Sequence, residues 1–531
     1  MSSNGTTYEA RYRELEAKRE PYLQRARECS ILTIPGLLPE EDAAEGSDLK
    51  SPAQNNGAKG VNSLSAKILL ALMPPNIPLF KLETNEVAQK ILASQDPAVE
   101  EMAREAKENM DRVPRAALLL TETFAHRPVV FEGIKQMVNG GNVLFWMMDA
   151  PKDRLGKMRA IPLNRYVVLR DSLGFPLEII IRDGLNASML PPKLQAILQS
   201  TKTEEELLKE ASEKKSGGTA PAYSIYTYAC WDPGMRKYKF GQEFMGKIVE
   251  GSTALFRAED CPLVPLRFST SDCEDYGRGL VEEYFGILQS IEAISQAEAA
   301  LAIIMSEVKF AVSPSSGIRA RDLQNSTQGS YHDVEPGAVQ AMSAEKYGDL
   351  AAMSRSKEGL QRDFDLAFLV NTAIQRSGER VTAEEIRTMM QLLDSTLGGL
   401  YSTLAADFQV PYVNYQLRLL KKTQGIDIGT SGAIRPRVVT GIEALGQSAE
   451  FMQFVEACKI ISELVGPAAF AQYAQVSGIA SRVFGYLNIE PAGLFKGKQE
   501  MQQEAAQAAQ QDENLRVAPV IAGAAAKAIA Q

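Results

Sequence analysis

Two long helical patterns on either side of a loop-rich insert constrain this chain more than any other feature. Apolar residues recur every three or four positions from Leu280 to Val308, and a second such pattern runs from residue 343 to about residue 371. The first helix is expected to be about 45 Å long at 1.5 Å per residue. The insert between them, residues 313–342, contains five Pro and Gly residues. Segments of this kind carry binding sites, so the pattern predicts two rigid helices that present a docking segment.

The first 276 residues mix helical and strand patterns. Alternation with a period of two starts near residue 158, and residues 166–171 and 177–182 with a turn at 172–174 predict a hairpin. Further strands are expected at 143–148, 222–231, 237–247 and 264–268. Helices are expected at 8–34, 60–73, 99–122, 128–137 and 203–215, and Pro21 is expected to break the first of them. We therefore predict an α+β fold that is predominantly helical and contains an antiparallel sheet.

A short polar loop at residues 375–380 follows the second long helix. Thr382 and Glu385 form a capping box that starts a third helix, running to about residue 407. More helices are expected at 412–422, 441–464 and 470–486. The Gln- and Ala-rich stretch 499–511 is either a lone polar helix or a disordered tail.

Charge and composition exclude several classes of protein. The chain has 531 residues, room for roughly three domains. Its 45% apolar and 23% charged residues exclude a disordered, collagenous or disulfide-scaffold protein. Lys and Arg number 57 against 66 Asp and Glu, a net charge of −9, so a tight non-specific DNA clamp, which needs a basic surface, is not expected.

Few residues are available for metal or acid–base chemistry. The two histidines, His126 and His332, show no partner pattern and are expected to be surface or capping residues. The five cysteines never show C-x-x-C spacing, which indicates a reducing compartment and no zinc site. The N-terminus does not resemble a signal peptide, and the best apolar stretch, residues 64–72, is too short to span a membrane. We expect a protein assembled in a cytoplasm, without cofactor or membrane.

Two motifs that could carry chemistry have simpler interpretations. Residues 441–448 are one position from a phosphate-binding loop, but Gln447 stands where the lysine belongs, so a helix start is favoured over an ATPase site. The acidic run 272–275 could bind a metal, but carboxylates adjacent in sequence rarely converge on one ion, so a turn or helix cap is favoured. No catalytic residue and no metal ligand is predicted.

Arg376 and Arg380 lie in the polar loop between two long helices. One interpretation is an exposed connection between helices, the default for an isolated chain. The other is a loop that presents two permanent cations to a ligand. The pattern alone favours the first.

The sequence resembles the portal, or head-to-tail connector, proteins of short-tailed phages of the autographivirus type. The stretches that carry the resemblance run from about residue 7 to 490: residues 57–60 with the helix to 73, the Asp-Tyr-Gly-Arg-Gly motif at 275–279 with 282–284, the block 375–387 with 396–399, and the turn at 441–446. The block 375–387 is the most specific. The resemblance implies a ring, usually of twelve subunits, at one capsid vertex, through which double-stranded DNA is packaged and ejected.

The resemblance also implies an order of parts along the chain. Residues 1–276 would be the wing, 277–308 and 343–372 the two stem helices, 309–342 the clip, 373–381 the tunnel loop, 382–435 a long wing helix and return, 436–495 the crown and 496–531 a tail. The expected partners are the terminase large subunit, the tail adaptor, major capsid and scaffolding proteins, and internal core proteins. An internal virion core or scaffold protein without a DNA channel remains the alternative.

Candidate site residues follow from the same resemblance. The tunnel loop and DNA gate would consist of Gln375, Arg376, Ser377, Gly378, Glu379 and Arg380, with Thr382 and Glu385 as the helix cap behind it. The docking surface of the clip would include Ile318, Arg319, Arg321, Tyr331 and His332.

Overall fold

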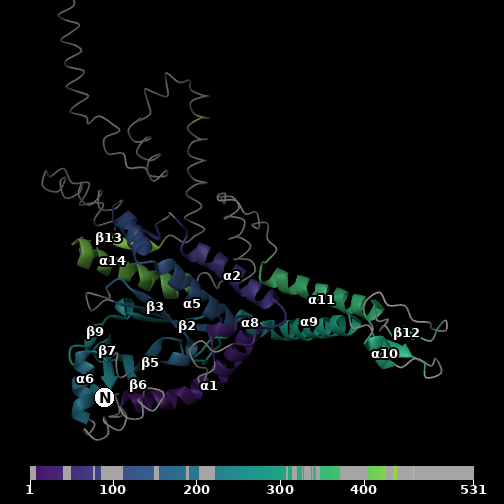
Figure 1. Ribbon diagram of the computed structural model, residues 1–531. Helices are drawn as coiled ribbons and strands as arrows, with labels where there is room; N and C mark the ends of the chain where they lie inside the picture. Colours follow the sequence, from purple (N-terminus) through teal and green to yellow (C-terminus); the bar gives the residue numbers. More distant parts are fainter. Residues whose placement is uncertain are drawn as a thin grey trace, which may run out of the picture. The chain divides into compact units, whose positions relative to one another are not determined.

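The structure is a computed structural model (Figure 1). It describes residues 7–39, 49–75, 78–84, 112–148, 155–186, 190–201, 222–306, 309–313, 320–325, 339–342, 347–370, 403–425 and 434–438, and the single residues 327, 337 and 459. The chain divides into two compact units, residues 1–442 and 443–531. All described residues except Lys459 belong to the first unit, which is the one described below.

A six-stranded antiparallel sheet forms one layer of this unit, which confirms the predicted sheet. Its strands are β4 (Tyr166–Arg170), β5 (Pro176–Asn186), β6 (Ala222–Asp232), β7 (Lys237–Phe244) and β8 (Lys247–Ile248) in that order, with β9 (Ala254–Phe256) on β7. The predicted hairpin is β4–β5, and Gly174 in its turn has a φ of +84° that glycine adopts without strain. Alternate residues of these strands, such as Ile179 and Ile181, fill the main core.

The first helix, α1 (Tyr8–Leu32), lies along this sheet and continues through Pro21 (Figure 1). The predicted break at Pro21 is therefore wrong. Proline removes one helical hydrogen bond, but buried side chains lie on both sides of it at helical spacing: Tyr8, Tyr12, Leu15, Leu23 and Ala26. The packing of this face against the sheet outweighs the local preference.

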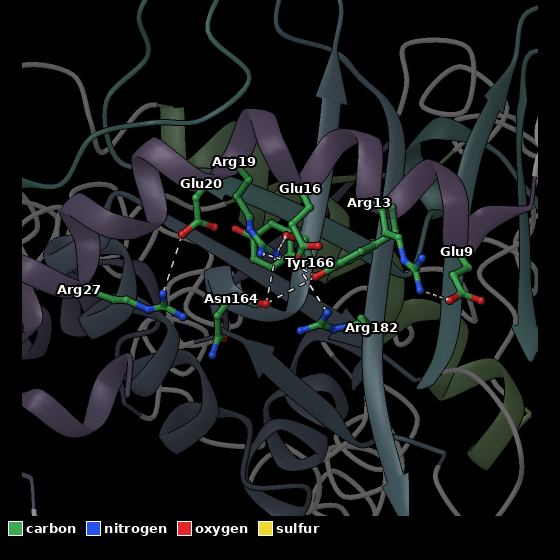
Figure 2. A network of polar contacts seen from close by, with 10 residues as sticks. Glu9, Arg13, Glu16, Arg19, Glu20, Arg27, Asn164, Tyr166 and Arg182 are labelled. Atoms are coloured by element: carbon green, nitrogen blue, oxygen red, sulfur yellow. Dashed lines mark hydrogen bonds and ion pairs between the residues drawn. The ribbon is translucent and has the colours of Figure 1, made fainter. Parts of the chain in front are cut away.

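A fully buried arginine fastens α1 to the edge of the sheet (Figure 2). Arg19 is 0% exposed, and its Nη1 donates to the carbonyl oxygens of Asn164 and Tyr166, both at 3.1 Å. The same atom donates to the Tyr12 hydroxyl at 2.8 Å, and Nη2 pairs with Glu16 at 3.0 Å. The buried guanidinium is tolerated because both of its Nη atoms find acceptors in this way, although its buried Nε has no hydrogen-bond partner among the described residues.

A second, three-stranded sheet has the order β10 (Leu263–Arg267), β2 (Asn142–Met147), β3 (Met158–Ile161). Helix α5 (His126–Gly140) packs on it and on α2 (Asn56–Leu72), and residues 112–123 are helical. The predicted helices and strands of this region are confirmed, with α2 beginning four residues earlier than expected. The shorter elements are the helices η1 (Pro35–Leu37), η3 (Leu163–Arg165), α6 (Pro192–Thr201) and η5 (Ala258–Asp260).

The first of the two long helices is interrupted. It consists of α8 (Leu280–Glu283) and α9 (Phe285–Ser306), with Tyr284 between them, whereas the sequence predicts one continuous helix. The second is α11 (Tyr347–Ala367), as predicted. Between them, β11 (Lys309–Val312) and β12 (Val339–Met342) pair as an antiparallel ribbon and α10 (Ala320–Gln324) is a short helix. This ribbon was not predicted, because four-residue strands show too little alternation.

The last described elements are η7 (Ala405–Gln409), a π-helical segment, α14 (Val410–Gln424), and β13 (Ile434–Val438), which pairs with β1 (Phe80–Thr84). Helix α14 confirms the predicted helix at 412–422. Several predicted helices lie outside the described residues: those at 203–215, at 441–464 apart from Lys459, and at 470–486. The same holds for most residues of the helices predicted at 99–122 and 382–407, and for the stretch 499–511.

One described helix has the length and composition of a membrane span. Residues Phe285–Ile304 of α9 have a mean hydropathy of 1.3, and 17% of this segment is buried. This segment is longer than residues 64–72, so the expectation that no apolar stretch is long enough to span a membrane is wrong by length and composition. The segment still carries Glu292 and Glu298, and both form polar contacts with other elements.

His126 is a core residue, so the expected surface or capping role is wrong. It is 0% exposed, and its Nε2 lies 2.6 Å from the carbonyl oxygen of Gly156. A carbonyl can only accept, so Nε2 carries the hydrogen and Nδ1 accepts from the hydroxyl of Tyr412 at 2.7 Å. Burial lowers the pKa of His126 below its ordinary value of about 6.5, and the hydrogen bond to Gly156 opposes this shift.

This lowered pKa predicts an acid-sensitive contribution to stability. The unfolded chain takes up a proton at His126 below about pH 6.5, whereas the folded protein resists it, so stability falls as the pH drops. The loss is expected to approach about 1.4 kcal/mol per pH unit until the folded pKa is reached. Thermal unfolding between about pH 5 and 8 measures it. The decline should be smaller in His126→Gln and unchanged in the control His332→Gln; equal declines in all three proteins would contradict it.

Candidate functional site at the paired long helices

Helices α9 and α11 pack against each other in antiparallel fashion (Figure 1). Tyr284, just before α9, makes an edge-on ring contact with Phe368, just after α11, with ring centroids 5.7 Å apart. Further along, Glu298 of α9 pairs with Lys357 of α11 at 2.8 Å. The β11–β12 ribbon joins the two helices at the other end. The predicted rigid helix pair with a segment between its helices is thus present.

Helix α2 fixes the point where the chain leaves α11. Phe364 and Phe368 stack with centroids 4.2 Å apart, and both are 0% exposed. A Cβ at Gly60 of α2 would lie 2.6 Å from the Phe364 ring, so glycine is needed for this approach. The ammonium of Lys67 donates to the carbonyl oxygen of Leu369, which has a left-handed φ of +56° and follows the end of the helix.

This anchor immediately precedes the loop at 375–380. The chain is held at Leu369 by this hydrogen bond. Gln375, Arg376, Ser377, Gly378, Glu379 and Arg380, with Thr382 and Glu385, lie outside the described residues. Lys67 and Gly60 were not predicted to hold the end of α11. The signal in the sequence that could have indicated them is a lysine and a glycine on an otherwise apolar face of a helix.

At the same end of the pair, the motif 275–279 packs against the junction of α5 and β2. The side-chain amide of Asn142 donates to the carbonyl oxygen of Gly277 at 2.7 Å, and its oxygen accepts from the Gly277 amide at 2.8 Å. A Cβ at Gly277 would lie 2.5 Å from the carbonyl oxygen of Ser269, and one at Gly279 would lie 2.5 Å from that of Asn139. Two segments separated by 135 residues therefore meet backbone to backbone.

The acidic run 272–275 serves the fold, which agrees with the favoured turn interpretation. Asp275 accepts from the backbone amide of Arg170 at 2.7 Å, and the Tyr276 hydroxyl accepts from that of Val168 at 3.0 Å. These side chains satisfy the free amides of edge strand β4. Within the described residues, no group of three or more His, Cys, Asp or Glu could hold a metal ion.

Arg278 connects the 275–279 motif to the helix that follows it. It pairs with Glu274 and with Glu282 of α8, each at 3.3 Å, and Arg25 of α1 reaches Glu282 at 2.5 Å. The first long helix is thus held at its start by the motif, by α5 and by α1.

A cavity of about 620 Å³ lies beside this junction, lined by residues of β4, β10, the 270–274 turn and η7. Burial is the main cause that lowers the pKa of Arg170 to about 10, and the nearby positive charge of Arg267 lowers it further. Burial also raises the pKa of Asp407 above its ordinary value. Arg170 donates to three carbonyl oxygens, of Asp275, Gly174 and Pro265. The guanidinium therefore braces the loops around the cavity.

Of the five predicted clip residues, the structure describes one. Arg321 lies exposed in α10. Ile318, Arg319, Tyr331 and His332 lie outside the described residues.

The charge of the first long helix has one sign. Residues 280–306 contain four acidic residues and neither lysine nor arginine. Two of the four are paired with cations of this chain, Glu282 with Arg25 and Arg278 and Glu298 with Lys357, so the helix presents less free negative charge than its sequence suggests.

Most of the chain is matched by a known family. A family model described as "Bacteriophage head to tail connecting protein" covers residues 5–492. The chain belongs to this family.

Portal proteins of two phages are similar to this chain over most of its length. The chain is 31% identical over 500 residues to the portal protein of Escherichia phage T7, across 94% of this chain and 90% of that protein. It is 30% identical over 502 residues to the portal protein of Enterobacteria phage T3, with the same two coverages. A solved structure of the neck of an empty GTA particle is similar at 12% identity and a TM-score of 0.37, over 77% of this chain and 86% of that chain.

The predicted resemblance and the α+β portal fold are thus confirmed, and the function is that of a phage portal. None of these relatives favours an internal core or scaffold protein.

Proposed function

We propose that this portal chain forms a closed ring of twelve subunits at one capsid vertex, and that double-stranded DNA is packaged and ejected through its tunnel. The antiparallel pair α9–α11 carries the proposal, because it is anchored by α2 and the 275–279 motif at one end and presents a ribbon at the other. Copies of such a pair, side by side, would make a tube. The net charge of −9 on each subunit would make the ring acidic, and an acidic wall would repel DNA and keep it sliding.

The exposed apolar residues of the pair support a contact between subunits. Leu366 of α11 is 76% exposed and Ile304 of α9 is 57% exposed. Apolar surface of this kind favours association, and a heterologous contact that closes on itself makes a ring.

Leu366→Lys is therefore expected to convert rings into monomers, because a charge would have to be buried in the contact. Negative-stain images and light scattering of the purified protein measure this. Leu173→Lys is the matched control, since Leu173 is 91% exposed in the β4–β5 turn. Rings in both variants would exclude this face as the contact, and a stable monomeric parent protein would contradict the ring itself.

The loop 375–380 would be the tunnel loop. Each copy would place one Arg376 in the narrowest part of the tunnel, where guanidinium groups can contact phosphates in two-pronged fashion. Like charges in such a collar repel, and Glu379 of a neighbouring loop is the nearest candidate partner. Thr382 and Glu385 would cap the helix behind the loop.

Arg376→Ala is expected to leave rings intact and to reduce the yield of packaged DNA or its retention. Counting filled capsids and measuring DNA loss on standing test this, with Arg380→Ala as the comparison for the second cation. Normal packaging and retention would contradict the gate, and loss of rings would show that Arg376 is structural.

Residues 309–342 would be the clip that docks the terminase large subunit and later the tail adaptor, through Ile318, Arg319, Arg321, Tyr331 and His332. The β11–β12 ribbon supports this, because it would hold the segment at the end of two rigid helices. Major capsid, scaffolding and internal core proteins would contact other parts, and assembly would take place in the host cytoplasm. The role is structural and requires no catalytic residue or cofactor.

A further inference from the structure

Two arginines converge on the turn between β4 and β5, in the lining of the cavity of about 620 Å³. Nη1 of Arg170, the last residue of β4, donates to the carbonyl oxygen of Gly174 at 2.9 Å. A Cβ on the same glycine would lie only 2.6 Å from Nη2 of Arg267, the last residue of β10. Because Gly174 has no Cβ, both guanidinium groups can approach it, and two positive charges lie close together beside the cavity.

The two guanidinium groups differ in how many of their donors are used. All three nitrogens of Arg170 donate to carbonyl oxygens, at 2.9 to 3.0 Å, which holds this charge in place. Arg267 uses one nitrogen, since its Nη1 donates to the carbonyl oxygen of Glu274 at 2.8 Å. Its Nε and Nη2 have no hydrogen-bond partner among the described residues, and both remain accessible. Arg267 therefore keeps donors for a ligand.

Acidic residues also line the cavity, but within the described residues none forms an ion pair with Arg170 or Arg267. Asp407 of η7 acts on both guanidinium groups through its charge alone, and so does Asp275, which lies outside the lining. The remaining acidic residues of the lining are occupied elsewhere or exposed: Asp171 by two backbone amides of its own turn, Glu274 by Arg278 at 3.3 Å, and Asp272 on the surface.

The surroundings of the two cations favour a negatively charged ligand. Burial lowers the pKa of Arg267, as it does that of Arg170, because a charged group loses water there without gaining a close counter-charge. An anion between the two groups would offset this cost. Asp407 lies in a π-helical segment, a distortion that frequently occurs at functional sites.

We propose that this cavity binds the phosphate group of a small molecule between the guanidinium groups of Arg170 and Arg267. Planar guanidinium groups bind phosphate oxygens in two-pronged fashion, and a phosphate dianion matches two adjacent positive charges. The volume of about 620 Å³ is typical of small-molecule sites, and Phe175, Val264 and Pro265 offer apolar surface for the rest of the molecule. The phosphate group would come either from free phosphate or from a phosphorylated small molecule.

Calorimetric titration of the purified protein with two probes tests the proposal. The probes are inorganic phosphate and deoxyadenosine monophosphate, each in a buffer without other phosphate. We expect saturable binding in the micromolar to millimolar range. A preference of about tenfold or more for the nucleotide would assign the site to a phosphorylated molecule, and similar affinities would assign it to free phosphate. Absence of binding by both probes would overturn the proposal.

Arg267→Gln is expected to weaken binding of the better probe about 10- to 100-fold, because it removes charge-assisted hydrogen bonds to the phosphate. Arg236→Gln is the matched control, since Arg236 is exposed in the turn between β6 and β7 and should leave the affinity unchanged. Arg267→Lys keeps the charge but not the two-pronged geometry, so its affinity should fall between the two. Equal affinities in Arg267→Gln and the control would contradict the site.

Asp407→Asn provides a test in the opposite direction. It removes a negative charge that acts on both guanidinium groups, so it should strengthen binding about 2- to 5-fold. A purely structural role of these residues predicts no such gain. If Arg267→Gln does not fold, this variant alone decides, and unchanged or weaker binding would refute the proposal. Ring images of the parent protein judge the proposed portal assembly separately, so either conclusion can stand without the other.

Discussion

Gly277→Ala is expected to prevent the protein from accumulating in folded form. The added Cβ would lie 2.5 Å from the carbonyl oxygen of Ser269 and 3.0 Å from that of Gly141, both backbone atoms that cannot rotate away. Relief of these contacts would pull Gly277 from Asn142 and break two hydrogen bonds with buried groups. Overpacking and two lost hydrogen bonds together are expected to cost about 3 kcal/mol or more. Soluble yield and the denaturant midpoint measure the effect.

Gly286→Ala is the matched control for this substitution. Gly286 lies in α9, and no atom would come within 4 Å of the added Cβ. Alanine has the higher helix propensity, so this variant should be as stable as the parent protein or up to about 1 kcal/mol more stable. If Gly277→Ala behaved like Gly286→Ala, the backbone contact between 275–279 and the α5–β2 junction would be wrong.

Arg19→Met is expected to destabilise the protein by about 3–5 kcal/mol, because it removes one partner from a buried charged network. The carbonyl oxygens of Asn164 and Tyr166 would lose a donor, and Glu16 would lose its closest ion pair (Figure 2). Methionine fills similar volume, so the loss reports on the polar contacts rather than on a cavity. Equilibrium unfolding in urea measures it.

Arg13→Met serves as its control on the same helix. The Arg13 side chain is 72% exposed and pairs with Glu9 at 2.7 Å, and such exposed pairs contribute less than about 1 kcal/mol. The two variants remove the same charge from α1 but should differ several-fold in cost. Similar costs would mean that Arg19 is not held as Figure 2 shows.

The elements that the sequence predicted best are those with a strong local period. Helices α9 and α11 were expected from apolar spacing, and the β4–β5 hairpin from alternation around Gly174. The wrong predictions concern residues whose structure depends on contacts with distant parts of the chain. Pro21 argued locally for a break, yet buried residues on both sides hold α1 together. His126 had no partner pattern nearby, because its partner Tyr412 lies 286 residues away.

The candidate site shows the same division. The sequence indicated the loop 375–380 and its capping box from residue type and spacing. It did not indicate what holds the preceding helix end, since Lys67 meets Leu369 across 302 residues. Similarly, Asp-Tyr-Gly-Arg-Gly at 275–279 was recognised as a motif, but its purpose became visible only when Asn142 was found clasping Gly277.

The sequence by itself determined the class of fold and the order of the helices and strands, because periodicity, caps and turn residues act within a few positions of the chain, and its resemblance to portal proteins indicated the family. The tertiary structure decided how α1 is capped and seated. The buried carboxylate of Glu243, some 235 residues away, accepts from the backbone amides of Tyr8 and Glu9 at 3.1 and 3.3 Å. Such contacts depend on which distant backbone atoms a fold brings within hydrogen-bonding distance, and no local pattern of residues encodes that distance.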